Sequence, residues 1–272
     1  MTRIALCQIP VATDPAANLE RARRALARAA ADGAELAILP EAALTRYGRR
    51  ITGLAEPLDG PFVTGLAAAA REHGLAVVAG VFETGSGPAA DGGPARVRNT
   101  AVALGPDGEL KAAYRKIHLF DSFGARESDL VEPGDTPVVV ELAGLRVGLV
   151  TCYDVRFPEL TRVLADLGAD LFAVIAAWGS GPMKEEHWAT LVRARALENT
   201  TWVAAVGQAP DPGAADGFGI GRSMLVDPLG VVRADLGPAP AVQTCVLDPE
   251  ATPAARALLP CLEHRRLKVN GP

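Results

Sequence analysis

Runs of consecutive apolar residues recur along the whole chain, and most of them are too short to be helices. Such runs, bounded by turn residues, are typical of strands that are buried on both faces of a sheet. We predict strands over 3–9, 35–39, 75–82, 97–104, 109–114, 137–142, 145–151, 171–176, 201–206 and 241–247, with a further hairpin around Pro228–Gly230. The turn at Pro106–Gly108 predicts that the strands on either side of it form a hairpin.

Between these runs, apolar residues recur with the spacing of helices. Asp14 and Pro15 supply an N-cap and a first-turn proline for a helix that reaches Asp32, and Gly33 follows as its C-cap. The other predicted helices cover 61–73, which Gly74 closes, 157–168, which Pro158 opens, 184–198 and a short C-terminal segment.

The order of these elements predicts layered sheets that are covered by helices. Helices alternate with strands in the first part of the chain, and hairpins then add strands to the same sheets. We expect an α/β fold in a single domain over residues 1–272, with a core at about 3–248 and a C-terminal helix and tail over 249–272. The segments 84–95, 121–136 and 178–183 are expected to be loops.

The composition favours a protein that acts on a small molecule. Hydrophobic residues make up 49% of the 272 residues, which allows a sizeable core, and the formal net charge of -5 argues against a nucleic-acid partner. The N-terminal run MTRIALCQIP is too short for a signal peptide, and no apolar segment approaches the roughly 18 residues that span a bilayer. We therefore expect a cytoplasmic protein without a membrane partner.

The cysteines and histidines indicate neither disulfides nor a metal site. Cys7, Cys152, Cys245 and Cys261 form no CxxC pair, and a reducing cytoplasm favours free thiols. Cys7 and Cys245 lie in apolar runs and are expected to fill the core, whereas Cys261 has no predicted role. No two of the four histidines have the spacing of metal ligands, so no metal is expected.

Cys152 stands where an apolar strand ends and a helix is about to begin. In Leu145–Glu159, which reads LRVGLVTCYDVRFPE, this position holds the sulfur out of the packed core and near a helix N-terminus, whose partial positive charge favours the thiolate. The position suits a nucleophile, although a lone cysteine is more often structural. The case for chemistry therefore depends on the rest of the chain.

Glu41 and Lys116 also follow apolar strands, and with Cys152 they would form an acyl-transfer apparatus. A thiol nucleophile needs a base, and a carboxylate can serve if desolvation holds its pKa near neutrality. An ammonium beside both would stabilise the oxyanion that forms when the thiolate attacks an amide carbon. Taken singly, Glu41 also fits a surface turn and Lys116 a solvated strand end.

Three short sequence motifs occur along the chain in a fixed order, and a chance match to all three is implausible. They are Leu39-Pro40-Glu41, YRKIHLF over residues 114–120 and CYDVRFPE over residues 152–159. Together they resemble the nitrilase superfamily of carbon–nitrogen hydrolases, in its amidase-like branch, and the resemblance runs from Arg3 to about Arg266. Further matches are Arg193–Asn199, Gly221–Met224, Asp227-Pro228 and Arg265-Arg266.

The resemblance implies a four-layer α-β-β-α sandwich whose subunits pair through their helices, as a homodimer or a higher homo-oligomer. It implies that Glu41 is the general base, Lys116 the oxyanion-stabilising lysine and Cys152 the nucleophile. It also implies that the backbone N–H of Tyr153 is a second oxyanion donor, and that Glu127 holds the lysine and the substrate in place. No metal or organic cofactor is implied.

Several nearby residues allow more than one interpretation. Arg156 is predicted to contact an anionic substrate, and the alternative is an ion pair with Asp154. Trp178 is predicted to line the pocket, and the alternative is that it only packs in the core. His118, His187 and Trp188 are expected to be structural. A network on a helix surface or at a subunit contact is expected for Arg193, Arg195 and Glu198.

The expected reaction is hydrolysis of a small amide through a thioester, with release of ammonia and a carboxylic acid. The CYDVRFPE string is most similar to omega-amidases and deaminated-glutathione amidases, which implies a substrate that carries a carboxylate. Hydrolysis of N-carbamoyl amides is the alternative. Nitrile hydrolysis ranks third because that branch has Cys-Trp-Glu where this chain has Cys152-Tyr153-Asp154. A catalytically idle ligand-binding member and a thiol-redox protein with Cys152 as sensor are alternatives from other classes.

Overall fold

The computed structural model describes residues 1–87, 95–211 and 218–267. Its strands are β1 (Thr2–Gln8), β2 (Leu36–Ile38), β3 (Ala76–Thr84), β4 (Val97–Leu104), β5 (Leu110–Arg115), β6 (Val131–Glu132), β7 (Val139–Leu142), β8 (Leu145–Thr151), β9 (Leu171–Ala176), β10 (Trp202–Gly207), β11 (Met224–Val226), β12 (Val232–Asp235) and β13 (Ala241–Leu247). Its helices are α1 (Pro15–Ala31), α2 (Ile51–Leu54), α3 (Pro61–His73), α4 (Pro158–Asp166), α5 (Lys184–Asn199), α6 (Ala251–Leu258) and α7 (Cys261–His264). Two 3-10 turns, at Glu127–Asp129 and Cys152–Arg156, precede β6 and α4.

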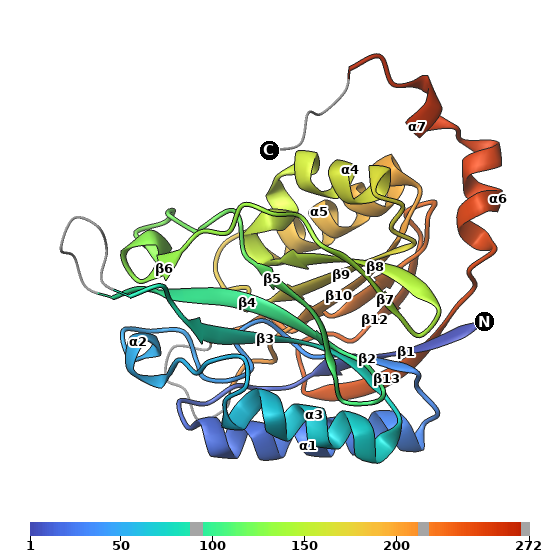
Figure 1. The fold of residues 1–272 in the computed structure, drawn as a ribbon. Coiled ribbons are helices and arrows are strands. Elements are labelled where there is room, and N and C mark those ends of the chain that lie inside the picture. The colour runs from blue at the N-terminus through green and yellow to red at the C-terminus, as the bar shows by residue number, and fades with distance from the viewer. Residues whose placement is uncertain (88–94, 212–217, 268–272) are drawn as a thin grey trace.

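Two β-sheets lie face to face between two pairs of helices (Figure 1). Among the described residues, one sheet has seven strands, in the order β13-β1-β2-β3-β4-β5 with β6 paired to β4, and the other has six, in the order β12-β11-β10-β9-β8-β7. Helices α1 and α3 cover the first sheet, and α4 and α5 cover the second. The predicted four-layer α-β-β-α sandwich is therefore confirmed.

The central strands β1, β2 and β3 of the first sheet are buried on both faces because each face packs against a different layer. Along β1, Ile4 and Leu6 belong to the core that the two sheets share, whereas Ala5 and Cys7 pack with the residues of α1 and α3. This arrangement explains why the strand reads as one continuous apolar run. Cys7 fills the core as predicted, and burial raises its pKa to about 12.

The predicted cap residues set the ends of the helices. The Asp14 carboxylate accepts a hydrogen bond from Ala16 N at 3.0 Å, and Pro15 is the first residue of α1. Gly74 ends α3 in the left-handed conformation, with a φ of 59° that favours glycine. Gly168, with a φ of 83°, lies just past α4, which therefore ends at Asp166 rather than at the predicted 168.

The structure also contains short elements that the apolar pattern did not predict. Helix α2 and strand β6 are each too short to produce a periodic pattern. The C-terminal helix is divided into α6 and α7, because Pro260 stands between them. Of the predicted loop 84–95, residue 84 belongs to β3 and residues 88–94 lie outside the described residues. Across the described ranges, no helix is long and apolar enough to span a membrane.

Parallel pairing brings the candidate catalytic residues to one edge of each sheet. Strands β1, β2 and β3 are parallel, and β5 runs in the same direction because β3 and β5 are both antiparallel to β4. Strands β8, β9 and β10 are parallel in the second sheet. Glu41, Lys116 and Cys152 follow the carboxyl ends of β2, β5 and β8. In open α/β sheets this edge is where ligands bind.

Candidate active site

Glu41 follows β2 at a point where the backbone lies close against β3. A Cβ atom on Gly80 of β3 would lie 2.5 Å from the Glu41 Cα and 2.7 Å from Ala42 N, so only glycine allows this approach. The next residue, Ala42, has a left-handed φ of 56°. Backbone packing therefore fixes where the Glu41 side chain begins.

The Glu41 carboxylate is buried and accepts hydrogen bonds on both oxygens. Its Oε1 accepts from Asn99 Nδ2 at 2.7 Å and from Lys116 Nζ at 3.1 Å, and its Oε2 accepts from Ala177 N at 2.6 Å. Ala177 follows β9, so the last bond connects the two sheets across the site. These donors hold the carboxylate in one orientation before any substrate arrives.

The Lys116 ammonium lies between two buried carboxylates. Its Nζ donates to Glu41 Oε1 at 3.1 Å and to Glu127 Oε2 at 2.9 Å, and the residue is 2% exposed. Burial alone would lower the pKa of Lys116, but the two carboxylates hold it well above its ordinary value. Lys116 is therefore a constant cation at the centre of the site.

Glu127 opens the 3-10 turn before β6 and is the second counter-ion of Lys116. Its Oε2 also accepts from Phe120 N at 2.6 Å, and its Oε1 accepts from Asn99 Nδ2 at 3.1 Å. Burial acts to raise the pKa of Glu127, but the charge and hydrogen bond of Lys116 hold it below its ordinary value. Glu127 is thus an ionised carboxylate whose lone pairs are committed to holding the lysine.

Cys152 begins the 3-10 turn that follows β8, in an unusual backbone conformation. Its φ of 50° is left-handed, which is uncommon for a residue with a side chain and is found most often at functional sites. The side chain is 9% exposed and lines the cavity described below. The predicted sharp turn from strand to helix is present, with the 3-10 turn inserted before α4.

The Cys152 sulfur is a thiol rather than a thiolate in the unliganded site. Burial raises the pKa of Cys152 well above 9.0, and the charge and hydrogen bonding of Glu41 raise it further, against the opposing effect of Lys116. Burial thus acts against the thiolate, in the opposite direction to the partial positive charge that the sequence analysis expected from the helix N-terminus. A base has to take the proton when the sulfur attacks.

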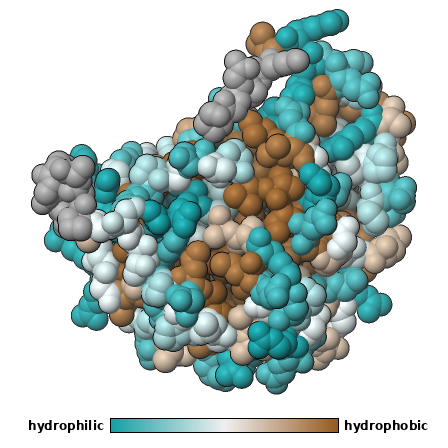
Figure 2. Space-filling view, in the orientation of Figure 1, coloured by the Kyte–Doolittle hydropathy of each residue, from teal (hydrophilic) through white to brown (hydrophobic). Residues whose placement is uncertain are grey.

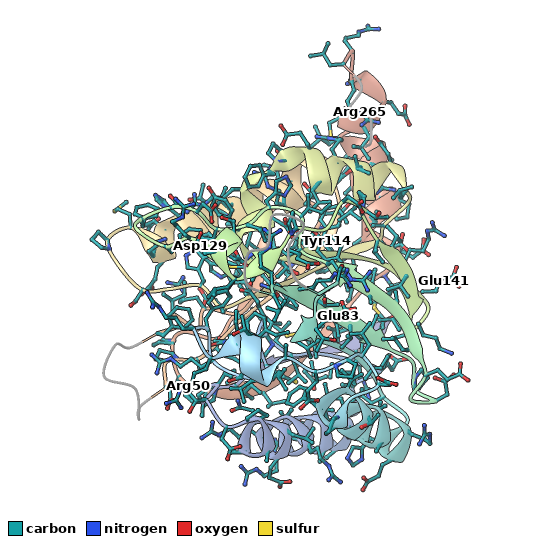
Figure 3. All side chains as sticks on the ribbon, turned by 60° about the vertical axis from the view of Figure 1, so that its left-hand side comes forward. Arg50, Glu83, Tyr114, Asp129, Glu141 and Arg265 are labelled. Carbon is teal, nitrogen blue, oxygen red and sulfur yellow. The ribbon has the colours of Figure 1, made fainter. Side chains whose placement is uncertain are left out.

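Asp154 joins the 3-10 turn that begins at Cys152 to the end of β5. Its Oδ2 accepts from Tyr114 Oη at 2.7 Å and from Thr151 N at 3.1 Å, and its Oδ1 accepts from His118 N at 2.9 Å. Figure 3 shows Tyr114 in the interior of the molecule. The alternative of an ion pair with Arg156 is wrong, because the Arg156 guanidinium lies against the rings of Trp178 and Tyr153 and against His187 instead. His118 has the structural role that the sequence predicted.

A cavity of about 510 Å³ adjoins the catalytic residues. Its described lining consists of Glu41, Tyr47, Gly48, Arg49, Lys116, Phe120, Phe123, Ala125, Arg126, Glu127, Leu130, Cys152, Tyr153, Ala177, Trp178, Gly179, Ser180, Lys184 and Phe218. The predicted loops 121–136 and 178–183 therefore contribute walls. The described residues of loop 84–95 contribute none. Within the described part of the chain, no three His, Cys, Asp or Glu side chains gather as a metal site would require.

Trp178 lines the cavity, whereas Arg156 is absent from its described lining. The Arg156 Cζ lies 5.1 Å from the centre of the Trp178 ring and 5.9 Å from that of Tyr153. Its Nη2 lies 3.3 Å from His187 Nδ1. The structure thus places Arg156 as a brace for the aromatic wall, and His187 as its partner.

Arg195 lies inside the molecule, contrary to the predicted surface network on α5. It is 5% exposed, donates to Val155 O at 2.8 Å and forms an ion pair with Glu198. The prediction failed because α5 packs this side against the 3-10 turn that begins with Cys152. Trp188 is structural as predicted: it is fully buried and donates to Arg222 O at 2.7 Å.

Three residues of the site were missed by the sequence reasoning. Asn99 donates to both Glu41 and Glu127, and its only sequence signal is that it is polar, like its two neighbours, in an otherwise apolar strand. Tyr47 lines the cavity, and burial together with the charge of Glu127 raises the pKa of its hydroxyl well above the ordinary value. Lys184, the first residue of α5, lines the cavity beside Trp178.

Comparison with known sequences places the chain among enzymes that break carbon–nitrogen bonds. The model of the carbon–nitrogen hydrolase family matches residues 3–257. The hydrolase Rv0480c of Mycobacterium tuberculosis is 45% identical over 97% of this chain and 95% of its own length. The deaminated glutathione amidase of Escherichia coli O157:H7 is 35% identical, with 92% of this chain and 91% of that protein covered. The human omega-amidase NIT2 is 33% identical, with 97% and 95% covered.

A solved structure with the same fold has a reactive cysteine. The amidase from Nesterenkonia sp. AN1 superposes with a TM-score of 0.81 and 29% identity, with 97% of this chain and 94% of that chain covered. A mutant of that amidase shows covalent addition of the acetamide moiety of fluoroacetamide at its active-site cysteine.

Proposed function

The chain belongs to the carbon–nitrogen hydrolase family and is an amidase-type hydrolase; we propose that it cleaves a small amide through a thioester on Cys152. The observation that carries this proposal is the buried group formed by Glu41, Lys116 and Glu127, with Cys152 beside it in the same cavity. It offers a nucleophile, a base and a permanent cation, which are the parts that acyl transfer requires.

The first step forms the acyl-enzyme. Glu41 takes the Cys152 proton as the sulfur attacks the amide carbonyl, since the thiol does not ionise by itself at neutral pH. The oxyanion that develops is stabilised by the Lys116 ammonium and by the backbone N–H of Tyr153. The C–N bond then breaks, and Glu41 returns the proton to the leaving nitrogen, which departs as ammonia.

The second step returns the enzyme to its starting state. A water molecule takes the place of ammonia, Glu41 removes one of its protons, and the oxygen attacks the thioester carbon. The C–S bond breaks, the sulfur recovers a proton and the carboxylic acid leaves. Glu127 takes no proton in this scheme, because its role is to keep Lys116 charged and in place.

We further propose a substrate that carries a carboxylate, and the charges around the cavity support this. Its described lining contains the cations Arg49, Arg126 and Lys184 in addition to Lys116. Its only carboxylates in the described lining are the two that already hold Lys116. A cavity with an excess of positive charge favours an anionic ligand.

Ammonia release from a substrate panel tests the proposal. We expect the chain to release ammonia from α-ketoglutaramate, from deaminated glutathione or from both, and the Cys152→Ala variant to release none. Ammonia from N-carbamoyl amino acids alone would assign a carbamoylase instead, and ammonia from nitriles alone a nitrilase. Turnover by Cys152→Ala would contradict the mechanism whatever the substrate.

We propose in addition that two copies of the chain pair through the α4–α5 layer. Figure 2 shows apolar surface over this layer. Large apolar side chains that are exposed near it and along the C-terminal helices are Leu167, Leu197, Leu258, Leu259 and Leu267. Such a surface is typical of an interface. Light scattering should give twice the mass of one chain, and the mass of a single chain would contradict the pairing.

A further inference from the structure

Lys184 occupies the rim of the catalytic cavity inside a group of aromatic rings. Its Nζ lies 4.2 Å from the centre of the Phe123 ring, 5.1 Å from that of Phe120 and 5.7 Å from that of Trp178. The backbone is fixed as well, because Lys184 O accepts a hydrogen bond from Trp178 Nε1 at 3.0 Å. The ammonium is therefore held at a defined place beside the reacting groups.

This cation has no carboxylate partner among the described residues. Two other cations of the lining are paired: Lys116 contacts two carboxylates and Arg126 contacts Asp129 at 3.1 Å. Arg49, the remaining cation of the lining, has no carboxylate partner among the described residues either, and it is therefore the competing candidate in the test below. The acidic residue that follows Lys184, Glu185, is bound to Arg222 at 2.8 Å. The rings offer Lys184 a weak attraction, but they leave its charge uncompensated.

The position of Lys184 is also electrostatically unfavourable in the unliganded site. It is the first residue of α5, where the helix dipole disfavours a cation. Partial burial, and after it the charge of Arg156, lower the pKa of Lys184. A negative charge on Cys152 would raise the pKa of Lys184. Lys184 therefore lies within electrostatic reach of the nucleophile.

Arg156 and Lys184 are the two cations beside Trp178, and of the two only Lys184 belongs to the described lining of the cavity. Arg156 contacts the rings of Trp178 and Tyr153 and the imidazole of His187, outside the described cavity lining. Lys184 belongs to that lining. A carboxylate that enters the cavity therefore meets Lys184 and not Arg156.

We propose that Lys184 binds the carboxylate of the substrate and thereby selects amides that carry an anionic group away from the reacting carbonyl. This inference rests on the proposed amidase activity. The rings of Phe120, Phe123 and Trp178 would cover the chain of carbon atoms between the amide and the carboxylate. The substrate class that fits is a monoamide of a dicarboxylic acid, or a larger amide with a carboxylate at its far end.

The test compares an anionic amide with a neutral amide of similar size. The quantity to measure is the ratio of kcat/KM for glutaramate to kcat/KM for butyramide. In Lys184→Met, which keeps a flexible apolar side chain, we expect this ratio to fall about 10- to 100-fold, because one charge-assisted hydrogen bond is lost. We expect most of the loss to appear in the KM for glutaramate, since the contact exists before the transition state as well as in it.

Two variants serve as controls. Lys111, an exposed lysine on β5 that pairs with Asp107, should tolerate the same Lys→Met change without an effect on the ratio. Arg49, a second cation of the lining, is the competing candidate. An unchanged ratio in Lys184→Met, or the same loss in Arg49→Met instead, would overturn the assignment.

A binding measurement separates this inference from the proposed activity. Calorimetry with glutaramate on the Cys152→Ala chain, with and without Lys184→Met, needs no turnover. Weaker glutaramate binding after Lys184→Met supports the role of Lys184, whether or not the chain turns the amide over. Failure of the unaltered chain to release ammonia would contradict only the proposed amidase function. Equal affinity in the two chains, or binding by neither, would overturn the role of Lys184.

Discussion

Lys116 at the catalytic centre and Lys184 at the rim of the same cavity are both cations, but only Lys116 has carboxylate partners among the described residues. Lys116 is 2% exposed and is held by Glu41 and Glu127 before any substrate arrives. Lys184 is partly exposed and touches only aromatic rings. The paired cation suits a step that needs fixed electrostatics, whereas the unpaired cation suits recognition of an anion.

Removing the central cation should have the largest effect. In Lys116→Met the carboxylates of Glu41 and Glu127 stay buried and keep their hydrogen bonds to Asn99 and to backbone N–H groups, but they lose their cation, so we expect the free energy of unfolding to fall by about 3–5 kcal/mol. Loss of the oxyanion partner should lower kcat by more than about 1,000-fold. Lys111→Met, at an exposed site, should change stability by less than about 0.5 kcal/mol. Wild-type stability and turnover in Lys116→Met would contradict the role of the pairing.

The state of the nucleophile can be read from its alkylation rate. Because burial raises the pKa of Cys152 above 9.0, its thiolate fraction should increase with pH throughout the range 8 to 10, and the rate of reaction with iodoacetamide should rise about 100-fold. Mass spectrometry of the Cys152 peptide measures this rate, and the Cys152→Ala chain supplies the background of the other three thiols. A plateau of the rate below pH 9 would show an activated thiolate instead.

Asn99 connects the two carboxylates of the centre and should have a moderate effect. Asn99→Ala removes the donor to Glu41 Oε1 and to Glu127 Oε1, while Lys116 continues to hold both carboxylates. We expect kcat to fall about 10- to 50-fold with little change in KM, since the geometry of the base loosens. Thr100→Val on the same strand removes a bond to Glu83 outside the cavity and serves as the control. Equal losses in both variants would indicate general damage to β4.

A substitution at the rim of the cavity, beside Lys184, should have the smallest effect on activity. Phe123 is 76% exposed and supplies the ring nearest to Lys184 Nζ. Phe123→Ala should raise the KM for glutaramate about two- to fivefold, because an exposed cation–π contact is worth about 0.5–1 kcal/mol. Leu110→Ala, at another exposed apolar residue, is the matched control. A loss of kcat in Phe123→Ala larger than the change in KM would contradict a role confined to binding.

The parts of this site that the sequence predicted are those whose signal is local. Glu41 and Cys152 each follow an apolar strand within a recognisable string, and the strand directions then bring them to one edge. The raised pKa of the Cys152 thiol could not be predicted from the sequence, because desolvation depends on residues that pack around it from distant segments.

The positions of Arg156 and Lys184 relative to the cavity could not be predicted from the sequence, for the same reason. Arg156 lies close to the nucleophile in the chain, but the fold turns it against Trp178 and His187. Lys184 stands 32 residues from Cys152, in a helix that the sequence treated as a separate element. Asn99 was missed because it stands in the polar run Arg98–Thr100 at the start of β4, and nothing distinguishes it there until Glu41 and Glu127 are placed around it.

The most direct test of the account is the mass of the enzyme during turnover. The chain should be mixed with its best amide substrate, quenched in acid within a few turnovers and digested. The account predicts an adduct on the peptide that contains Cys152, with the mass of the substrate less ammonia, and no adduct on the peptides of Cys7, Cys245 and Cys261. Steady ammonia release without an acyl adduct on Cys152, or continued release by Cys152→Ala, would contradict it.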